Sequence, residues 1–480
     1  MNKLNFFIGR QSERALLEDL YQMQSAELIS ITGRRRVGKT QLVNEVLGNR
    51  IDFHLTGTQN KTATHQLRNF AFKLGEKTGK KADQPVPRDW QEAFFTLIYY
   101  LQEIEGDKKL VVFLDELPWL ATPRSGFLDA FSFFWNSWAE QRNILVIICG
   151  SAASWMINKV VRNKGGLHNR ITKRIQLEPF TLAETAEYLR AIGYRDNAYA
   201  FAELYMVMGG IPHYLKELNP TESNTQNIDR ICFASSGLLH DEFNRLYPAL
   251  FDNAKRHIDV VRTLAAHVNG LTRKQILTQT GLSDGGSLKR LLEELEFSGF
   301  VQSFYTHGKR KKGKIYRLID AYSLFYLRFV EHRKIDGVGA WQSASTSQAY
   351  KSWRGYAFEN LGLQHIQQIK AALGIAGVAT VTSTFYAAPT DTQRGLQIDL
   401  VLDRADRTIN LCEFKFYDQI LSLSSADLDR LEDRRRRFIE LTGTRKTVLV
   451  CLVCPFGISE GSNRGGVVSG VVGLGDLMGG

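Results

Sequence analysis

Gly33-Arg34-Arg35-Arg36-Val37-Gly38-Lys39-Thr40 is the stretch that decides the fold of this 480-residue chain. It fits the pattern GxxxxGK(S/T), in which a glycine-rich loop surrounds phosphates with backbone N–H groups. Apolar residues 28–32 before it predict a buried strand, and residues 41–47 after it predict the start of a helix. A chance glycine-rich turn is the alternative, but strand, loop and helix in that order point a helix N-terminus at a polyphosphate. The stretch therefore predicts a nucleotide-binding α/β domain.

Each position of this phosphate loop has an expected role. Gly33 and Gly38 allow the tight turn and the close approach of the backbone to the phosphates. Lys39 would reach the β- and γ-phosphates, and Thr40 would hold Mg²⁺ through its hydroxyl. The other expected nucleotide contacts are Arg34, Arg35, Arg36, Val37 and Gln41.

The second strong signal is an apolar run, residues 110–114, that ends in Asp115 and Glu116. Such a run is typical of a buried parallel strand whose acids lie at the carboxyl edge of the sheet, where ligands bind. Asp115 would hold Mg²⁺ through water, and Glu116 would orient or deprotonate the attacking water. A strand that merely ends in a polar turn would look similar, and the phosphate loop upstream favours the catalytic interpretation.

A third buried strand is predicted at residues 144–149, followed by Gly150 and Ser151. If this strand lies between the other two, Ser151 is placed to sense the γ-phosphate. Arg170 precedes a further short strand at 175–177 and is a candidate to act on the γ-phosphate in cis or in trans. A plain surface charge is the equal alternative for Arg170.

Six stretches within the first 330 residues together resemble the archaeal-type ATPases, a branch of the STAND group of AAA+-like P-loop ATPases. In order, they are FIGRQSE, ITGRRRVGKT, VVFLDELPWL, ICGSAASWM, RITKRIQLEPF and MGGIPHYL. The resemblance implies ATP hydrolysis and a helical lid closed by Gly209-Gly210-Ile211-Pro212, with Pro212 sensing the nucleotide. The residues alone indicate only a glycine–proline break between helices.

A winged helix-turn-helix is predicted between residues 251 and 335. Helices are expected at 258–268, 272–280 and 286–298, followed by two strands around the basic turn 308–314, which carries five Lys or Arg residues. A recognition helix and a cationic wing suit major-groove docking and phosphate contacts. In STAND-type ATPases, which the chain resembles, this module also serves as an intramolecular brace. The positive charge of the wing favours contact with DNA over the brace.

The C-terminal segment carries Asp399 in one predicted strand and Glu413-Phe-Lys415 in the next. Period-2 geometry places Glu413 and Lys415 on one face. The two carboxylates would share Mg²⁺ while Lys415 steadies a hydroxide or a phosphate, and Glu359 in the preceding helix would be a further ligand. A cross-strand ion pair between Asp399 and Lys415 is the alternative, and the order of the four residues favours a nuclease-like site.

This segment resembles PD-(D/E)xK nucleases and the domain of unknown function that accompanies many archaeal-type ATPases. It departs from the usual nuclease pattern because no proline precedes Asp399. The run Arg434-Arg435-Arg436-Arg437 in the following helix is a candidate DNA contact, with a solvated helix face as the alternative.

The predicted fold class is α/β, with a parallel-sheet P-loop core, a helical lid, a winged helix and a restriction-endonuclease-like domain. The expected boundaries are 1–180, 181–250, 251–335 and 353–480, with a polar linker at 337–352. No apolar run approaches the roughly 20 residues that span a bilayer, and no signal-peptide core is found at the N-terminus, so we expect a cytoplasmic protein. Five scattered cysteines suit a reducing compartment, and Cys451-Leu-Val-Cys454 is interpreted as strand interior rather than half a zinc site.

The formal net charge of +11 favours a polyanionic partner. We expect an enzyme that hydrolyses ATP with Mg²⁺ and couples nucleotide state to DNA binding or to metal-dependent DNA cleavage. The rivals are a nucleotide-gated DNA-binding regulator with a silent C-terminal domain, and a signalling switch whose C-terminal modules bind proteins. ATP, DNA and a second copy of the chain are the expected partners.

Overall fold

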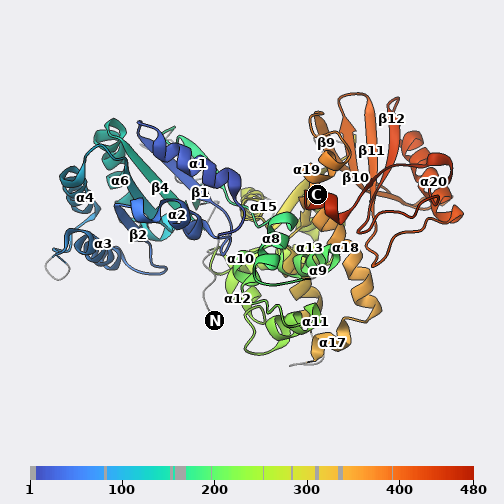
Figure 1. Ribbon diagram of the computed structural model, residues 1–480, viewed down its shortest axis with the longest axis horizontal. Coiled ribbons are helices and arrows are strands. Elements are labelled where there is room, and N and C mark those ends of the chain that lie inside the picture. Colours follow the sequence, from blue (N-terminus) through green and yellow to red (C-terminus); the bar gives the residue numbers. More distant parts are fainter. Residues whose placement is uncertain are drawn as a thin grey trace. The chain divides into compact units, whose positions relative to one another are not determined.

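The computed structural model describes residues 7–80, 84–151, 155–156, 169–195, 197–251, 253–282, 285–308, 313–332, 339–391 and 393–479. The chain forms two compact units (Figure 1). Residues 5–178 make up the first unit, and residues 179–480 belong to the second.

The first unit is built on a parallel five-stranded sheet with the strand order β2-β3-β4-β1-β5. Its strands are β1 (Glu27–Thr32), β2 (Phe53–Thr56), β3 (Leu110–Asp115), β4 (Ile144–Gly150) and β5 (Lys173–Gln176). The three central strands are buried along their whole length, as expected for parallel strands with helices on both faces. β4 lies between β3 and β1, which is the arrangement that the expected role of Ser151 requires.

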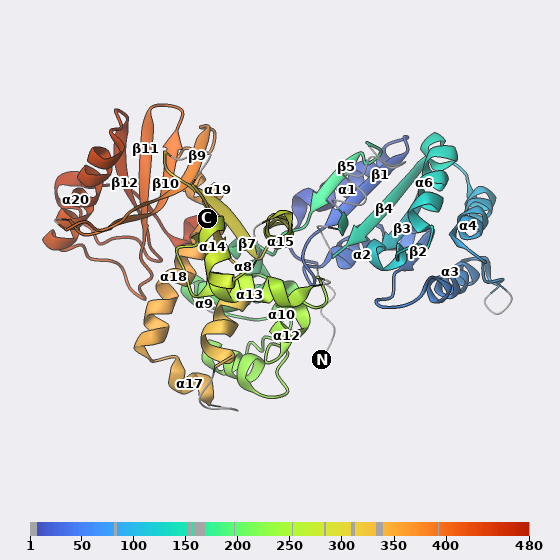
Figure 2. The same cartoon turned by 180° about the vertical axis from the view of Figure 1, so that it is seen from behind.

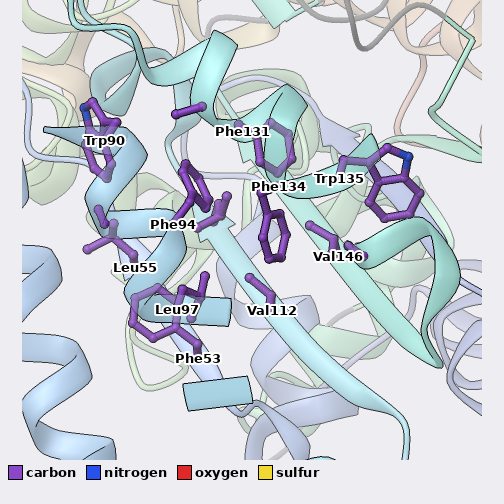
Figure 3. Packing of buried hydrophobic residues seen from close by; sticks show 14 of the residues in the cluster. Phe53, Leu55, Trp90, Phe94, Leu97, Val112, Phe131, Phe134, Trp135 and Val146 are labelled. Carbon is purple, nitrogen blue, oxygen red and sulfur yellow. The ribbon is translucent and has the colours of Figure 1, made fainter. Parts of the chain in front are cut away.

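The helices of the first unit cover both faces of this sheet (Figure 1). They are α1 (Gln11–Gln22), α2 (Lys39–Leu47), η1 (Gly48–Arg50), α3 (Ala63–Thr78), α4 (Trp90–Ile104), α5 (Leu117–Leu120), α6 (Phe127–Ser137) and η2 (Ala139–Gln141). On the face of α3, α4 and α6 an aromatic core packs against the strands (Figure 3). The ring centres of Phe94 and Phe134 lie 5.3 Å apart, and both residues belong to the same buried cluster as Val112 and Val146. This packing fixes β3 and β4, whose carboxyl ends carry the acidic residues and Ser151.

The second unit contains one eight-stranded sheet with the order β13-β12-β11-β10-β9-β7-β8-β6. The strands are β6 (Leu271–Thr272), β7 (Val301–Thr306), β8 (Lys314–Leu318), β9 (Thr380–Ala387), β10 (Leu396–Arg404), β11 (Thr408–Phe414), β12 (Thr447–Val453) and β13 (Val468–Val472). β7 and β8 form the hairpin expected for the wing, and β7 also pairs in parallel with β9 (Figure 2). The strands assigned to two separate domains thus form a single sheet, because the open edge of the wing hairpin is completed by a distant strand.

The second unit also contains helices, some of which pack on this sheet. They are α8 (Leu182–Ala191), α9 (Ala198–Met208), α10 (Pro212–Leu215), α11 (Asn224–Ile228), η4 (Asp229–Phe233), α12 (Glu242–Leu246), α13 (Ala254–Ala265), α14 (Arg273–Thr280), α15 (Gly286–Phe297), α16 (Ala321–Phe325), η5 (Tyr326–Val330), α17 (Ala340–Ala344), α18 (Gln348–Gln364), α19 (Ile366–Ala372), α20 (Ser425–Thr442), η6 (Arg464–Gly466) and α21 (Leu474–Leu477). Three of them, α13 to α15, lie where the helices of the winged helix were expected. The helix α20 packs on one face of the sheet through Phe438.

The polar linker predicted at 337–352 is wrong for its described part, residues 339–352. Trp341 in α17 is 1% exposed, and its ring lies 4.9 Å from those of Phe325 and Tyr350. The buried Asp229 carboxylate accepts a hydrogen bond from the Trp341 N–H at 2.7 Å. Two aromatic side chains inside a polar stretch are enough to dock it, since each removes a large apolar area from water.

All five cysteines are buried and unpaired, and Cys451 lies inside β12 as expected. No helix in the described part of the chain combines the length and apolar composition that would take it across a membrane.

Candidate functional site

The phosphate loop leaves the carboxyl end of β1 through Gly33. Gly33 has a φ of 147°, and a Cβ at this position would lie 2.3 Å from the Leu177 carbonyl oxygen. Gly38, with a φ of 96°, caps the N-terminus of α2 in the left-handed region. Glycine is therefore required at Gly33 by steric contact and is favoured at Gly38 by its backbone conformation.

Lys39 lies inside the loop and is 6% exposed. Its ammonium donates to the carbonyl oxygens of Gly33 at 3.0 Å and Arg34 at 3.1 Å. Burial lowers the pKa of Lys39, and the negative Glu116 opposes that shift. Phosphate oxygens are stronger acceptors than these carbonyls, so a nucleotide can replace them as partners of the ammonium.

The two expected magnesium ligands of the first unit are joined directly. Thr40 donates its hydroxyl hydrogen to Asp115 Oδ2 at 2.7 Å, across 75 residues of sequence. Burial raises the pKa of Asp115, and the bond from Thr40 opposes the shift. A hydroxyl and a carboxylate are hard oxygen ligands, and Mg²⁺ in phosphate sites takes one or two such groups together with phosphates and water. These two side chains fit that requirement.

Glu116 and Ser151 are also in contact. The Ser151 N–H and hydroxyl both donate to Glu116 Oε2, at 3.1 and 2.8 Å. Glu116 has a φ of 49°, a left-handed conformation that is uncommon for a residue with a side chain. Such strain is found at functional sites where the surroundings hold it in place.

The arginines of the loop differ in environment. Arg34 is buried, the Arg35 guanidinium lies 6.0 Å from the ring centre of Trp119, and Arg36 has a φ of 74°. Trp119 is a residue that the sequence argument missed as a candidate. Its signal was its place three residues after Glu116.

A second missed residue is Arg10, which precedes α1 and is 4% exposed. Its Nη2 donates to the carbonyl oxygen of Val37 in the phosphate loop at 3.4 Å. Gln41, in contrast, is exposed on α2. Arg10 follows Gly9 in the first of the six stretches that carry the family resemblance, which was the available signal.

Arg170 does not lie at the nucleotide edge of its own sheet. The Thr172 N–H donates to the Leu28 carbonyl at 2.8 Å, which places Arg170 beside the start of β1, whereas the phosphate loop follows its end. Six residues of strand separate these edges by about 20 Å. Arg170 forms an ion pair with Glu140. Its expected action in cis is therefore wrong, and an action in trans stays a prediction.

Pro212 is the first residue of α10 in the second unit. The Phe180 N–H donates to the Gly210 carbonyl at 2.8 Å, and a Cβ at Gly210 would lie 2.2 Å from the Phe180 carbonyl oxygen. A side chain at position 210 would clash with this oxygen, so the position requires glycine. The sensing role of Pro212 stays a prediction.

The C-terminal candidates come together where the first half of β10 lies beside the end of β11. Leu400 pairs with Cys412, so Asp399 and Glu413 follow as the next partners in an antiparallel register and share a face. A register shift between Ile398 and Val401 against β9 accompanies this position. The Phe414 N–H donates to Asp399 Oδ2 at 3.2 Å. Burial, followed by the negative Glu359 and Glu413, raises the pKa of Asp399 to about 8.

Two of the three carboxylates in this cluster form ion pairs with cationic side chains. Lys415 donates to Glu413 Oε1 at 2.9 Å, and Arg434 forms an ion pair with Glu413 Oε2. Glu359 is paired at 2.5 Å with Arg317, a buried residue of β8 that the sequence argument missed. Lys415 therefore pairs with Glu413 rather than with Asp399.

No group of three or more His, Cys, Asp or Glu side chains is arranged to hold a metal ion within the described residues. The expected metal site of Glu359, Asp399 and Glu413 is thus not formed in this arrangement, because Arg317, Lys415 and Arg434 neutralise two of its three acids.

The four arginines of the run 434–437 already have partners within the second unit. Arg434 is bound to Glu413 and to the Gln397 carbonyl, Arg435 and Arg436 pair with acids three residues earlier in α20, and Arg437 donates to the Arg394 carbonyl. The alternative of a solvated helix face fits Arg436, whereas Arg434 and Arg437 are held by contacts within the unit. The wing residues Lys309, Arg310, Lys311 and Lys312 lie outside the described residues.

Comparison with known proteins supports a nucleotide-binding function for the N-terminal part of the chain. Residues 7–218 match the family described as an ATPase domain predominantly from Archaea. This part of the chain is therefore similar to ATPase domains of the archaeal type, which supports ATP as its nucleotide and ATP hydrolysis as its activity. Its placement in the STAND group stays a prediction.

Over 418 residues the chain is 23% identical to the uncharacterized protein MJECL04 of Methanocaldococcus jannaschii, covering 86% of this chain and 88% of that protein. The Walker-type ATPase PABY2304 of Pyrococcus abyssi is similar in structure, with a TM-score of 0.51 and 18% identity over 67% of this chain and 96% of that chain. This likeness shows a shared fold. The ORC2 protein of Aeropyrum pernix, with ADPNP and ADP, gives a TM-score of 0.41 at 14% identity over 72% of this chain and 98% of that chain.

Proposed function

We propose that the chain is an ATP-driven switch, in which ATP binding and hydrolysis in the first unit control how the second unit engages DNA. The main observation in favour of ATP binding and hydrolysis is the 2.7 Å hydrogen bond between Thr40 and Asp115. It joins the phosphate loop to the acidic strand at the place where a magnesium–nucleotide complex needs hard oxygen ligands.

Lys39 would exchange its two carbonyl partners for β- and γ-phosphate oxygens. Thr40 and Asp115 would hold Mg²⁺, which when bound neutralises part of the phosphate charge. Arg10 would keep the loop in shape through the Val37 carbonyl. Binding therefore uses groups already within hydrogen-bonding distance of the loop.

Glu116 would act as the base that positions and deprotonates the attacking water. Both of its bonds to Ser151 go to one oxygen, Oε2. A γ-phosphate oxygen is a strong acceptor for the N–H and the hydroxyl of Ser151, so it would compete for these donors and release Glu116 towards the water. Ser151 would thus report the γ-phosphate by giving up its carboxylate partner.

Engagement of DNA by the second unit is supported by the three helices and the hairpin of the winged-helix segment. The exposed positions near the start of α15 include Lys289 and Arg290, and Lys289 lies 3.9 Å from Glu293. The chain as a whole carries a formal charge of +11. Exposed cations on a recognition helix suit phosphate contacts, which add salt-dependent affinity.

The direct test measures ATP hydrolysis and duplex-DNA affinity on the full chain. Lys39→Ala should remove hydrolysis, while Asn44→Ala, at an exposed position of the same helix, should leave the rate within about twofold of wild type. DNA affinity measured with and without a non-hydrolysable ATP analogue should differ in wild type and not in Lys39→Ala. Equal DNA affinity in both nucleotide states of the wild type would refute the switch.

Metal-dependent DNA cleavage by the second unit is the second candidate. It is favoured by Asp399 and Glu413, which are neighbours on one sheet face with Lys415 beside Glu413. A divalent cation would have to displace Lys415 or Arg434 from Glu413. Plasmid cleavage with Mg²⁺ or Mn²⁺, with and without ATP, separates this candidate from a DNA-binding regulator and from a signalling switch with a silent C-terminal domain.

A further inference from the structure

A row of aromatic rings leads from the core of the second unit to its surface beside Lys415. Phe358 in α18 is fully buried, and its ring centre lies 4.9 Å from that of Phe416, the residue after Lys415. Phe416 stacks on Tyr199 of α9 at 4.5 Å with an angle of 13° between the rings. Tyr199 in turn stacks on Phe456 at 5.8 Å and 16°. We call Phe416, Tyr199 and Phe456 the aromatic ladder.

The outer end of the ladder is exposed to solvent. Phe456 is 39% exposed, and Tyr417, the residue after Phe416, is 47% exposed. Burial of a large aromatic side chain stabilises a protein, so rings left in solvent next to a stacked row are more typical of a binding surface than of a packed core.

The rings are held in place by their neighbours. The Arg354 guanidinium donates to the Tyr199 hydroxyl at 2.7 Å and lies 5.8 Å from the ring centre of Phe416. Arg354 also pairs with Glu203 at 3.5 Å. Since Phe358 supports the inner end and Arg354 the middle, the outer ring has a fixed orientation, which reduces the entropy lost when a flat ligand stacks on it.

Positive charge adjoins the ladder. Lys415 precedes Phe416 in the sequence; its ammonium is paired with Glu413, and its side chain is 38% exposed. Arg354 adds a second cation, with a side chain that is 21% exposed. Aromatic faces next to cations are the combination by which proteins hold single-stranded nucleic acids, since unpaired bases stack on the rings and phosphates meet the cations.

We propose that the aromatic ladder is a binding site for unpaired bases of a single-stranded nucleic acid, with Phe456 as the stacking ring and Arg354 as the cation beside the rings. The inference rests on the proposed engagement of nucleic acid by the second unit and names the substrate class at its C-terminal end. Paired bases cannot stack on Phe456, because both of their faces are covered inside a duplex.

The test uses the full chain in EDTA and a fluorescent 15-nucleotide single strand, with a duplex of the same sequence as the second ligand. Phe456→Ala should weaken single-strand binding about 5- to 100-fold, as expected for one lost base–ring stack, and should leave duplex binding within about twofold. Phe456→Trp should bind at least as tightly as wild type, whereas Phe456→Leu should behave like the alanine variant, because leucine keeps apolar bulk without a π face.

Tyr386→Ala is the matched control, since Tyr386 is a more exposed aromatic of the same unit, at 57%, on β9. Unchanged thermal unfolding and ATP hydrolysis of the Phe456 variants would show that folding and the first site are intact. The proposal is overturned by a wild type that does not bind the single strand, by equal losses for single strand and duplex, or by a leucine variant that binds like wild type. The last result would favour a protein partner at this surface.

Discussion

Tyr305 of β7 and Ser383 of β9 are register partners in a parallel strand pair, although 78 residues separate them. Together with Thr306 and Thr384 they join the wing hairpin to the C-terminal strands. The winged-helix segment and the cluster around Asp399 consequently belong to one sheet. The strands of the wing hairpin are therefore joined to the C-terminal strands by backbone pairing within the sheet as well as by the chain that connects them.

Glu116→Gln should bind ATP with near wild-type affinity and hydrolyse it at least about 100-fold more slowly, because proton transfer by a positioned base contributes about 10²- to 10⁴-fold. Lys39→Ala should instead weaken ATP binding itself by about 10- to 100-fold, since a charged hydrogen bond to the phosphates contributes roughly 1.5–3 kcal/mol. Nucleotide binding by calorimetry and phosphate release measure the two effects. Equal hydrolysis rates in wild type and Glu116→Gln would remove Glu116 from its role.

Neutralising Lys309, Arg310, Lys311 and Lys312 together should weaken duplex binding on all sequences alike. Each phosphate contact contributes about 0.9 to the slope of log affinity against log salt, so the slope should flatten by up to about four. A salt titration of DNA affinity measures it. If affinity and slope are unchanged, the wing is an intramolecular brace.

If the second unit cleaves DNA, Asp399→Ala and Lys415→Ala should each abolish metal-dependent plasmid cleavage while ATP hydrolysis stays within about twofold of wild type, because the two sites lie in separate compact units. Arg245→Ala is a suitable control, since Arg245 forms an exposed ion pair with Asp241 in the same unit. Absence of cleavage in the wild type with Mg²⁺ and Mn²⁺ would leave the cluster as a structural set of ion pairs.

Trp341→Ala should destabilise the second unit by about 3–5 kcal/mol, the range found for removal of a buried tryptophan or phenylalanine. The side chain is 1% exposed and packs against Phe325, Phe329 and Tyr350. Urea unfolding followed by tryptophan fluorescence and by circular dichroism measures the loss. A change below about 0.5 kcal/mol would mean that residues 339–352 are a linker after all.

His54 should make the first unit less stable in acid. Burial, with the positive Lys73 and Lys77, lowers the pKa of His54 to about 4 from its ordinary 6.5. As the pH falls below about 6.5 the unfolded chain binds a proton that the folded chain takes up only near pH 4, so the free energy of unfolding decreases over this range. Because His54 is only half-buried, we expect a loss on the order of 1–2 kcal/mol, absent in His54→Gln. Equal pH dependence of urea unfolding in both proteins would contradict it.

The contacts among Thr40, Asp115, Glu116 and Ser151 were largely predictable from the sequence. The phosphate loop, Asp115 and Glu116 form a local pattern in which each residue follows its own strand, and parallel strands in one sheet bring their carboxyl ends together. The bond from Thr40 to Asp115 follows from this topology. The error over Arg170 has the same origin, because the sequence indicated a nearby strand but not which end of the sheet Arg170 would occupy.

The cluster around Asp399 was predictable in its acids and not in its cations. Asp399, Glu413 and Lys415 are near one another in a hairpin, so period-2 geometry sufficed. Arg317 and Arg434 come from β8 and α20, and their pairing with Glu359 and Glu413 required the fold. The local spacing thus predicted a metal site where the distant residues supply counter-ions.

By itself the sequence determined the P-loop α/β core, the positions of the helices and hairpin of the winged-helix segment and the residues of both clusters. These features depend on local periodicity and on short motifs, in which each residue constrains its near neighbours. Only the tertiary structure decided that β7 pairs with β9, that Trp341 docks a polar stretch and that Tyr199 stacks between Phe416 and Phe456. Such contacts join residues far apart in the chain, and strand edges and aromatic faces accept many partners, so shape and packing in the folded unit select among them.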